Sequence, residues 1–366
     1  MDISSLVEII REKEESDENK RRKTYTGRKI YVNLEEPIAS ALLFDYDVND
    51  FFGNPEFYLR QTLIQKLWRF ENIDDYCCID TQIPLWLGHY PEYSFFGMEA
   101  SYTATGIPNM KVNSEMKSAQ DISPLSTVDF YNTGVMPKAH RMYNRLVELV
   151  EGKANINFLS WWRGPLDLAI QLRGYEGFIA DTSENPEFVH ELMNFLTTER
   201  IRWHEAYRRH FKITEISPTG IGDDWINSPF ITPSIFEEYV LPYYFKIEKA
   251  HGGIGGIHSC GNQAPFQKLM LKINSLQGFE VSAWTSLEDT LKNIPPEKYL
   301  VISVHPNDVL FASQTQIKEQ LGKISKLCSG RNFSLTTSGL TPVRMNEKEY
   351  LDLIKTWLMY AKETFE

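Results

Sequence analysis

The order of its expected secondary structure is the feature that most limits how this chain can fold. Short apolar runs typical of buried strands alternate with longer helical segments through the second half of the sequence. Such alternation indicates parallel βαβ units. No glycine fingerprint of a dinucleotide-binding fold is present, so the sequence predicts an α/β protein built as a (β/α)8 TIM barrel rather than a doubly wound sheet. The expected strands are residues 156–162, 215–221, 252–258, 276–281, 299–304 and 333–338.

The barrel is expected to carry two additions. Residues 1–46 are charged and only weakly periodic, and we assign them to an N-terminal extension that contains a short helix. Residues 47–366 are assigned to the barrel itself. Residues 84–136 are rich in aromatic, serine, asparagine and glycine residues. Because this segment is too long for a plain connection, we expect a loop-rich insertion.

Helix signals are clearest where a cap residue precedes proline. Asn54 and Pro55 are typical of the start of an aromatic-rich helix within residues 47–70. Residues 76–80 are expected to form a strand that ends in the carboxylate of Asp80. Further helices are predicted at residues 137–151, 185–210, 263–272, 314–327 and 346–364.

Composition restricts the possible partners and the compartment. The 366-residue chain has a formal net charge of −11, which argues against binding to nucleic acid or to an anionic membrane. Its first residues lack the pattern of a signal peptide, and no run is long and apolar enough to span a membrane. Four cysteines are too few for a disulfide scaffold of this size. We therefore expect a cytoplasmic protein.

One short stretch concentrates chemically reactive side chains. His258 and Cys260 follow the glycine-rich run 252–257 and precede Gly261 and Asn262. An imidazole and a thiol at the end of a barrel strand are ligands that zinc prefers, and a catalytic zinc needs three protein ligands and one open position. The alternative is a hydrogen-bonded histidine beside a buried thiol.

Several other polar residues also follow expected strands. Asp223 and Asp224 could act in catalysis, bind a cationic group or bind metal, and one of them could instead cap a turn. Glu280 and His305 end two further strands and would face the same barrel mouth as Asp80. Each of these residues could also be a hydrogen-bonded structural group. As catalytic residues we select Asp223, Asp224 and Glu280.

Four segments together resemble the uroporphyrinogen decarboxylase superfamily. They are residues 162–166, 181–191, 234–242 and 258–262, and the resemblance extends from about residue 47 to the C-terminus. The family implies a (β/α)8 barrel. Within it, the His-x-Cys-Gly-Asn motif is similar to that of zinc methyltransferases, which move a methyl group between a corrinoid protein and a thiol such as coenzyme M.

The resemblance implies a partly complete metal site. His258 and Cys260 match the family's zinc ligands, whereas the family's second cysteine, after the last strand, has no counterpart in this chain. Ser338 lies nearest to its expected position, and a hydroxyl is a poor zinc ligand beside a thiolate. The third ligand is therefore left open between His305, Ser338, Glu280 and the aspartates 223 and 224.

The resulting hypothesis is a zinc-dependent, corrinoid-linked methyltransferase. Its zinc would activate a small thiol or related acceptor, and the corrinoid would be carried by a partner protein. We assign Asp80, Trp162 and Asn262 to substrate binding. One alternative is a metal-free decarboxylase or lyase, although the arginine-rich motif of true uroporphyrinogen decarboxylases is absent. Another is a non-catalytic corrinoid- or tetrapyrrole-binding relative. The composition does not choose between monomer and homodimer.

Overall fold

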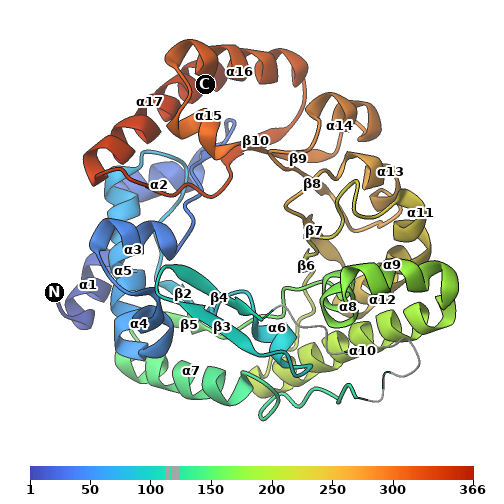
Figure 1. The fold of residues 1–366 in the computed structure, drawn as a ribbon. Helices are drawn as coiled ribbons and strands as arrows, with labels where there is room; N and C mark the ends of the chain where they lie inside the picture. Colours follow the sequence, from blue (N-terminus) through green and yellow to red (C-terminus); the bar gives the residue numbers. More distant parts are fainter. Residues whose placement is uncertain (112–115, 117–121, 123) are drawn as a thin grey trace.

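The strands of the protein form a ring with helices around its outside (Figure 1). The structure is a computed structural model that describes residues 1–111, 116, 122 and 124–366. This arrangement agrees with the α/β class that the alternation of strands and helices predicts. The strands of the ring are β1 (Ile30–Tyr31), β2 (Gln82–Pro84), β5 (Asn155–Asn157), β6 (Thr219–Gly222), β7 (Ile254–His258), β8 (Gly278–Val281), β9 (Tyr299–Val304) and β10 (Phe333–Thr337).

Hydrogen bonding joins these strands in parallel groups rather than in one closed ladder. The largest group has the order β1-β10-β9-β8, and β2 pairs with β5 while β6 pairs with β7. A parallel bridge between Arg163 and Gly222 connects the segment after β5 to β6. The amide of Tyr76 donates to the carbonyl of Ile30, 3.1 Å away, near the β1–β2 junction. The strands therefore follow one another around the ring, but the hydrogen bonds between them are not continuous.

Buried and partly exposed side chains alternate along the strands, so one set faces the core and the other the interior of the ring. In β9, Leu300, Ile302 and Val304 are buried, while Val301 and Ser303 between them are partly exposed. Successive side chains of a strand point to opposite faces, so the apolar set packs against the helices and the other set lines the ring. The same geometry brings the residues that follow parallel strands to one end of the ring.

The helices surround the ring along the whole chain. Most lie on its outer side in Figure 1. Their bounds are α1 (Ile3–Glu14), α2 (Asp17–Thr24), α3 (Ile38–Phe44), α4 (Val48–Gly53), α5 (Pro55–Asn72), α6 (Pro91–Ser94), α7 (Met136–Val150), α8 (Pro165–Arg173), α9 (Tyr175–Glu184), α10 (Pro186–Phe211), α11 (Pro233–Ile235), α12 (Leu241–His251), α13 (Gln267–Met270), α14 (Leu287–Asn293), α15 (Pro306–Leu310), α16 (Gln314–Leu327) and α17 (Glu347–Phe365).

Capping explains why several helices begin where the sequence predicts. Asn54 accepts hydrogen bonds from the backbone amides of Glu56 and Phe57, and Pro55 is the first residue of α5. Reciprocal side-chain and backbone bonds form capping boxes at the starts of α16 and α17. The predicted helix at residues 314–327 matches α16, and the one at 346–364 matches α17 within a residue. These predictions are confirmed.

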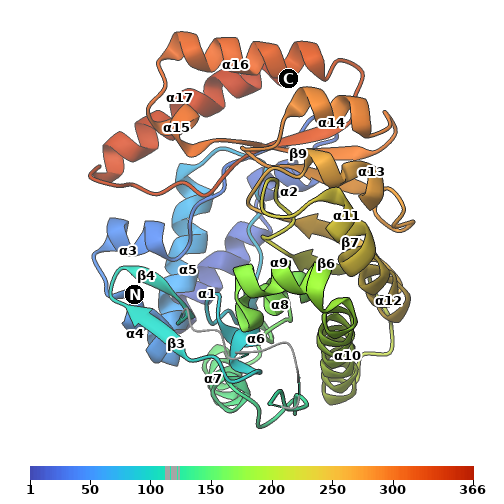
Figure 2. The same ribbon diagram turned by 45° about the vertical axis from the view of Figure 1, so that its right-hand side comes forward.

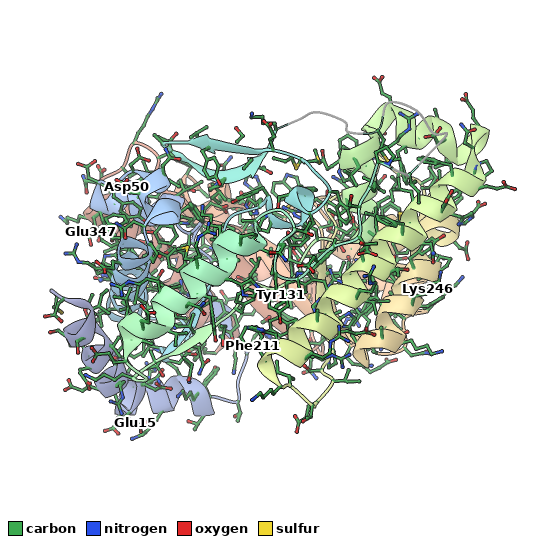
Figure 3. The ribbon with its side chains drawn as sticks, turned by 90° about the horizontal axis from the view of Figure 1, so that it is seen from below. Glu15, Asp50, Tyr131, Phe211, Lys246 and Glu347 are labelled. Carbon is green, nitrogen blue, oxygen red and sulfur yellow. The ribbon has the colours of Figure 1, made fainter. Side chains whose placement is uncertain are left out.

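An aromatic cluster joins α7 to α10 on the side seen in Figure 3. The ring of Tyr131 lies 5.2 Å from His140 of α7 and 5.6 Å from His210 of α10. Tyr143 and Phe211 continue the contact with a centroid separation of 5.5 Å. Large aromatic groups that bury much apolar area hold neighbouring helices together. The aromatic richness of the sequence is thus used here for packing.

The N-terminal extension and the insertion that we predicted each contain β structure. β1 lies within residues 1–46, yet it pairs with β10 in the main sheet. The expected insertion at 84–136 contains an antiparallel hairpin, β3 (Ala100–Thr103) and β4 (Gly106–Met110). The hairpin lies beside α4 in Figure 2, where the amide of Val48 donates to the carbonyl of Ala104. The part of this insertion at residues 112–115, 117–121 and 123 lies outside the described residues.

The prediction of a strand at residues 76–80 was wrong. No regular strand occurs there, and β2 begins two residues after Asp80. Side chains take the backbone groups that a strand would pair: Asp75 accepts from the amide of Cys77, and Asn19 bonds both the amide and the carbonyl of Ile79. Because Asp80 precedes its strand rather than following it, it lies at the opposite end of β2 from the one expected.

Two expectations from composition can be compared with the structure. None of the described helices combines the length and apolarity needed to cross a lipid bilayer. The four cysteines all carry free thiols, and Cys328 is buried. The prediction that the fold has no disulfide scaffold is confirmed.

Asp75 connects the N-terminal helices to the ring. Its carboxylate accepts from the amide of Val32 at 2.8 Å and pairs with Arg69 of α5. The guanidinium of Arg22 in α2 lies 3.8 Å away, and the side chains of Arg22 and Asp75 are 2% and 0% exposed. A buried charge without its partner is strongly destabilising. Asp75 is therefore one of the buried groups that fix α2, together with Asn19, which bonds the backbone of Ile79.

We predict that Asp75→Ala lowers the free energy of unfolding by about 3–5 kcal/mol, because it leaves Arg22 and Arg69 without a buried counter-charge. Chemical denaturation measures this change. Asp74→Ala is the matched control: Asp74 also pairs with Lys362 and Arg21, but it is 66% exposed, so its loss should cost less than about 1 kcal/mol. Equal losses in the two variants would contradict the role given to Asp75.

Candidate functional site

A cavity of about 710 Å³ opens at the end of the ring where the parallel strands finish. Its walls come from residues at or after the ends of most strands, as expected for the catalytic face of a barrel. The side chains that line it are mostly polar. They are Asn33, Glu35, His89, Asn109, Trp162, Arg163, Asp224, His258, Cys260, Glu280, Ser282, Trp284, Val301, Ser303, Pro306, Thr336, Thr337, Ser338 and Gly339.

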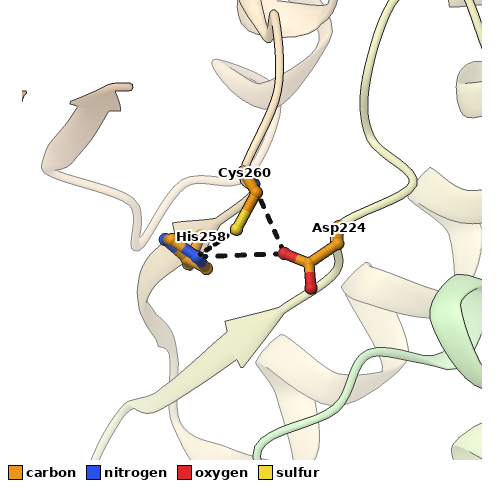
Figure 4. Close-up of side chains that lie close together, drawn as sticks. All are labelled: Asp224, His258 and Cys260. Atoms are coloured by element: carbon orange, nitrogen blue, oxygen red, sulfur yellow. Dashed lines mark hydrogen bonds and ion pairs between the residues drawn. The ribbon is translucent and has the colours of Figure 1, made fainter. Parts of the chain in front are cut away.

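Asp224, His258 and Cys260 converge in this cavity (Figure 4). One potential ligand atom from each lies within 4.8 Å of the other two. The His258 Nε2 atom is 3.4 Å from Cys260 Sγ and 3.8 Å from Asp224 Oδ1. His258 and Cys260 come from the end of β7, and Asp224 follows β6, with which β7 pairs. The parallel pairing of two strands thus brings residues 34 and 36 positions apart in the sequence into contact.

Glu280 fixes the orientation of the histidine ring. Its Oε2 atom lies 2.8 Å from His258 Nδ1. Glu280 belongs to β8, so three successive strands of the ring contribute to the group. A carboxylate that holds one ring nitrogen leaves the other nitrogen to face a ligand, which is the usual arrangement behind a metal-bound histidine. Here the free nitrogen is the one that faces Asp224 and Cys260.

The local charges shift the pKa values of the group in opposite directions. Burial alone would lower the pKa of His258, but its hydrogen bonds with Cys260 and Glu280 raise it to about 10. Burial would raise the pKa of Asp224, and the neighbouring guanidinium of Arg163 more than offsets this, so the pKa is lowered. A cation that binds there competes with protons for His258.

Arg163 supports Asp224 from the other side and was not selected from the sequence. Its Nη1 atom donates to Asp224 Oδ2 at 2.7 Å and to Asp167 Oδ2 at 2.8 Å. The side chain is 11% exposed, and Asp167 is buried at 2%. The pair leaves Oδ1 of Asp224 directed at His258 and Cys260. A sequence signal was present, since Arg163 directly follows an expected strand and lies in the Trp-Arg-Gly-Pro motif.

Asp223 has a different environment from its neighbour. It is fully buried, and its Oδ2 atom accepts from the Tyr244 hydroxyl at 2.8 Å and the Leu166 amide at 3.3 Å. Burial raises its pKa well above the usual value of an aspartate. A Cβ on Gly164 would clash with this carboxylate at 2.1 Å. Asp223 is outside the cavity lining and joins β6 to the start of α8, so its predicted catalytic role has no support from its position.

Trp162 lies flat against β6 within the cavity. A Cβ placed on Gly222 would lie 1.9 Å from its Nε1 atom, and one on Gly220 would lie 2.6 Å from its ring. Only glycine at these two positions leaves room for the indole. The ring centroid is 6.3 Å from that of His258. Its position is compatible with the substrate-binding role that we predicted.

The two other residues predicted to bind substrate are used differently. The side-chain oxygen of Asn262 accepts from the backbone amide of Ala264 at 3.1 Å. The backbone amide of Asn262 donates to the side-chain oxygen of Asn227 at 2.9 Å, so Asn262 shapes the turn after Cys260. Asp80 accepts from Lys66 at 2.6 Å before β2 begins. The structure therefore does not bring Asp80 together with His258. Its substrate-binding role is not supported by its position.

His305 and Ser338, two other candidates for the third ligand, differ in their relation to the cavity. The Nδ1 atom of His305 accepts from the Asn307 amide at 3.1 Å and caps α15. Ser338 lines the cavity, and its amide donates to the carbonyl of Val304. Among the residues that the structure describes, Asp224, His258 and Cys260 form the one group of three metal-ligating side chains.

The three side chains fit a zinc ion in number and type. One thiolate, one imidazole nitrogen and one carboxylate oxygen are ligands that zinc accepts, and three protein ligands leave a fourth position for substrate. The neighbouring Glu280 supplies the second interaction that orients a histidine ligand. The fit rests on this chemistry and on the convergence of the three atoms.

Several further cavity residues were missed because they come from weakly patterned segments. Glu35 follows the very short β1, and Asn109 comes from the β3–β4 hairpin. Glu92 supports the site from below the surface, because it accepts from the backbone amides of Trp162 and Arg163.

Comparisons with known proteins give a family and one informative likeness. The model of the family described as uroporphyrinogen decarboxylase (URO-D) matches residues 91–336. No curated protein matches the chain. Among solved structures, a methyltransferase from Methanosarcina mazei has a TM-score of 0.65 and 13% identity, and the match covers 93% of this chain and 94% of that one.

A second solved structure is described as a putative vitamin-B12 independent methionine synthase from Listeria monocytogenes. Its TM-score is 0.36 at 12% identity, with coverage of 66% of this chain and 72% of that one. The likeness to the Methanosarcina protein shows the fold, and together with the family it implies an α/β TIM barrel. The family model matches two thirds of the residues of this chain, and the chain therefore belongs to the uroporphyrinogen decarboxylase family.

Proposed function

We propose that the protein is a zinc-dependent methyltransferase that moves a methyl group between a corrinoid protein and a small thiol. The observation that carries this proposal is the convergence of Asp224, His258 and Cys260 within 4.8 Å at the mouth of the ring. Membership of the family and the fold shared with a Methanosarcina mazei methyltransferase support it. Asp224 is proposed as the third ligand, in place of the cysteine that this chain lacks.

In the proposed reaction the carbon–cobalt bond of a partner's methylated corrinoid would break and leave its electron pair on cobalt. A carbon–sulfur bond would form, and the thiol would lose its proton. Zinc at this site would supply the chemistry that keeps a thiol as a nucleophilic thiolate at neutral pH. Glu280 would orient His258, and Arg163 would hold Asp224 in place. The open end of the cavity leaves room for the thiol and for the approach of a corrinoid protein.

The alternative of a metal-free decarboxylase has less support. That function would use several carboxylates together, but Asp80 and Asp223 lie outside the cavity. Only one lining side chain among the described residues is an arginine or lysine, and this Arg163 is already paired with two carboxylates. A substrate with many carboxylates would meet little positive charge there. The site fits methyl transfer better.

We predict that the purified protein binds about one equivalent of zinc. Asp224→Ala, His258→Ala and Cys260→Ala should each lower the zinc content to well below half an equivalent, because each removes one of three ligands. Inductively coupled plasma mass spectrometry after dialysis measures this content.

Matched variants decide which residue is the third ligand. His305→Ala should retain the full zinc content, because His305 lies outside the cluster. Ser338→Ala should retain it as well, because a hydroxyl is a poor zinc ligand beside a thiolate. Loss of zinc from Ser338→Ala together with its retention by Asp224→Ala would refute the assignment of Asp224.

Glu280 should affect affinity rather than stoichiometry. Because it orients the ring of His258, Glu280→Ala is predicted to weaken zinc binding by about 10–100-fold. Competition with a coloured chelator measures the dissociation constant. Glu288→Ala removes an exposed carboxylate that pairs with Lys323 and should leave the constant unchanged, whereas equal weakening in both variants would contradict the role of Glu280.

Methyl transfer itself is tested with methylcobalamin as the probe for the corrinoid. We expect the zinc-loaded protein to accelerate the anaerobic demethylation of methylcobalamin by 2-mercaptoethanol, followed by its visible absorbance. Cys260→Ala should remove the acceleration. A zinc-loaded wild-type protein without any acceleration, tested also with aminothiols, would count against the proposed reaction while leaving the metal site intact.

A further inference from the structure

We infer that the thiol used by this site carries a positive charge, and that Glu35 and the indole of Trp284 recognise it. This inference rests on the proposed function, since it concerns the thiol that would occupy the zinc site. It is drawn from the charges and rings that line the same 710 Å³ cavity as Cys260. An aminothiol is the chemical class that fits these walls.

The charged residues of the cavity are mostly negative and mostly paired. Asp224 is neutralised by Arg163, and Glu280 holds His258. Burial lowers the pKa of His89 to about 4, so this histidine is neutral and adds no positive charge. Zinc with the thiolate of Cys260 and the carboxylate of Asp224 would be formally neutral, and the charge of Arg163 would then be balanced by its second partner, Asp167. The walls therefore favour a cationic group over an anionic one.

Glu35 is the carboxylate that remains available. Among the described residues, its side chain makes neither a hydrogen bond nor an ion pair, although it is partly buried. It follows β1, and a Cβ on Gly339 would lie 2.1 Å from its Oε2 atom, so it rests against the backbone after β10. A partly desolvated carboxylate without a partner attracts a cation strongly. Consistently, burial raises the pKa of Glu35.

Two exposed indoles complete this environment. Trp284 is 55% exposed and Trp162 is 43% exposed, although large apolar side chains are normally buried. Both line the cavity, and Trp284 is held edge-on by His305 with ring centroids 5.5 Å apart. Indole faces attract organic cations, and quaternary ammonium groups in particular. A carboxylate and two indoles in one cavity therefore match an ammonium-bearing molecule.

Glu35 and the metal cluster lie on different walls of the same cavity. The order β1-β10-β9-β8 places the end of β1 across the cavity from His258 and Cys260, with the walls formed by Ser303 and Thr336 between them. A thiol whose sulfur lies at the cluster would have Trp284, which follows β8, beside it and would direct its other end toward Glu35. The two ends of the cavity thus have separate roles.

The test compares four thiols of equal chain length that differ in the terminal group. They are thiocholine, 2-aminoethanethiol, 2-mercaptoethanol and 2-mercaptoethanesulfonate, and their dissociation constants for the zinc-loaded protein are measured by isothermal titration calorimetry. The cationic pair should bind at least about tenfold more tightly than 2-mercaptoethanesulfonate. Zinc-free protein is the control for binding to the metal.

The four thiols also differ in the acidity of the thiol group, which affects their dissociation constants. Variants of the cavity separate this effect from recognition of the charged end. Glu35→Gln should reduce the preference for the two cations about tenfold and leave 2-mercaptoethanol binding unchanged. Glu297→Gln removes an exposed carboxylate outside the cavity and should alter none of the constants. Trp284→Leu should weaken thiocholine more than 2-aminoethanethiol, which provides a second test with a different side chain.

The outcomes distinguish this inference from the proposed function. Tightest binding of 2-mercaptoethanesulfonate, or a preference that Glu35→Gln leaves intact, would overturn the inference while the zinc–thiol function stands. Zinc-independent binding, or no binding of any of the four thiols, would overturn the proposed function and this inference with it.

Discussion

The common direction of the strands is the constraint on which the site depends. Because β6 and β7 pair in parallel, the residues after them leave the sheet at the same end. Asp224 therefore meets His258 and Cys260 although it precedes them by more than thirty positions. β8 continues the same direction and brings Glu280 against the histidine. If one of these strands ran the opposite way, its ligand would lie at the other end of the ring.

Most of the fold could be predicted from the sequence because its signals are local. Periodicity and caps located β9, α16 and α17 to within a residue. The short β1 could not be recognised, since two residues carry no periodicity and its place depends on pairing with β10. The irregular segment before β2 could not be predicted either, because its backbone bonds side chains, among them Asp75 and the distant Asn19 of α2.

The site was predictable in part for the same reason. His258 and Glu280 end clear strands, so their convergence follows from the barrel. The choice between Asp223 and Asp224 was not available from the sequence, because successive residues point to opposite faces and the register decides which one enters the mouth. Asp80 shows how sensitive such inferences are to strand limits. A shift of a few residues moved its carboxylate from the predicted open end to the start of β2.

Carboxylates of one chemical type take on separate roles here through their surroundings. Asp223 is buried against a hydroxyl and an amide, and its raised pKa favours the neutral form. Asp224 is held charged by Arg163, which suits a ligand to a cation. Glu280 is occupied by a histidine ring. Each of these three has a partner among the described side chains or backbone, so the remaining cavity carboxylate, Glu35, is the one whose counter-charge is left for a substrate to provide.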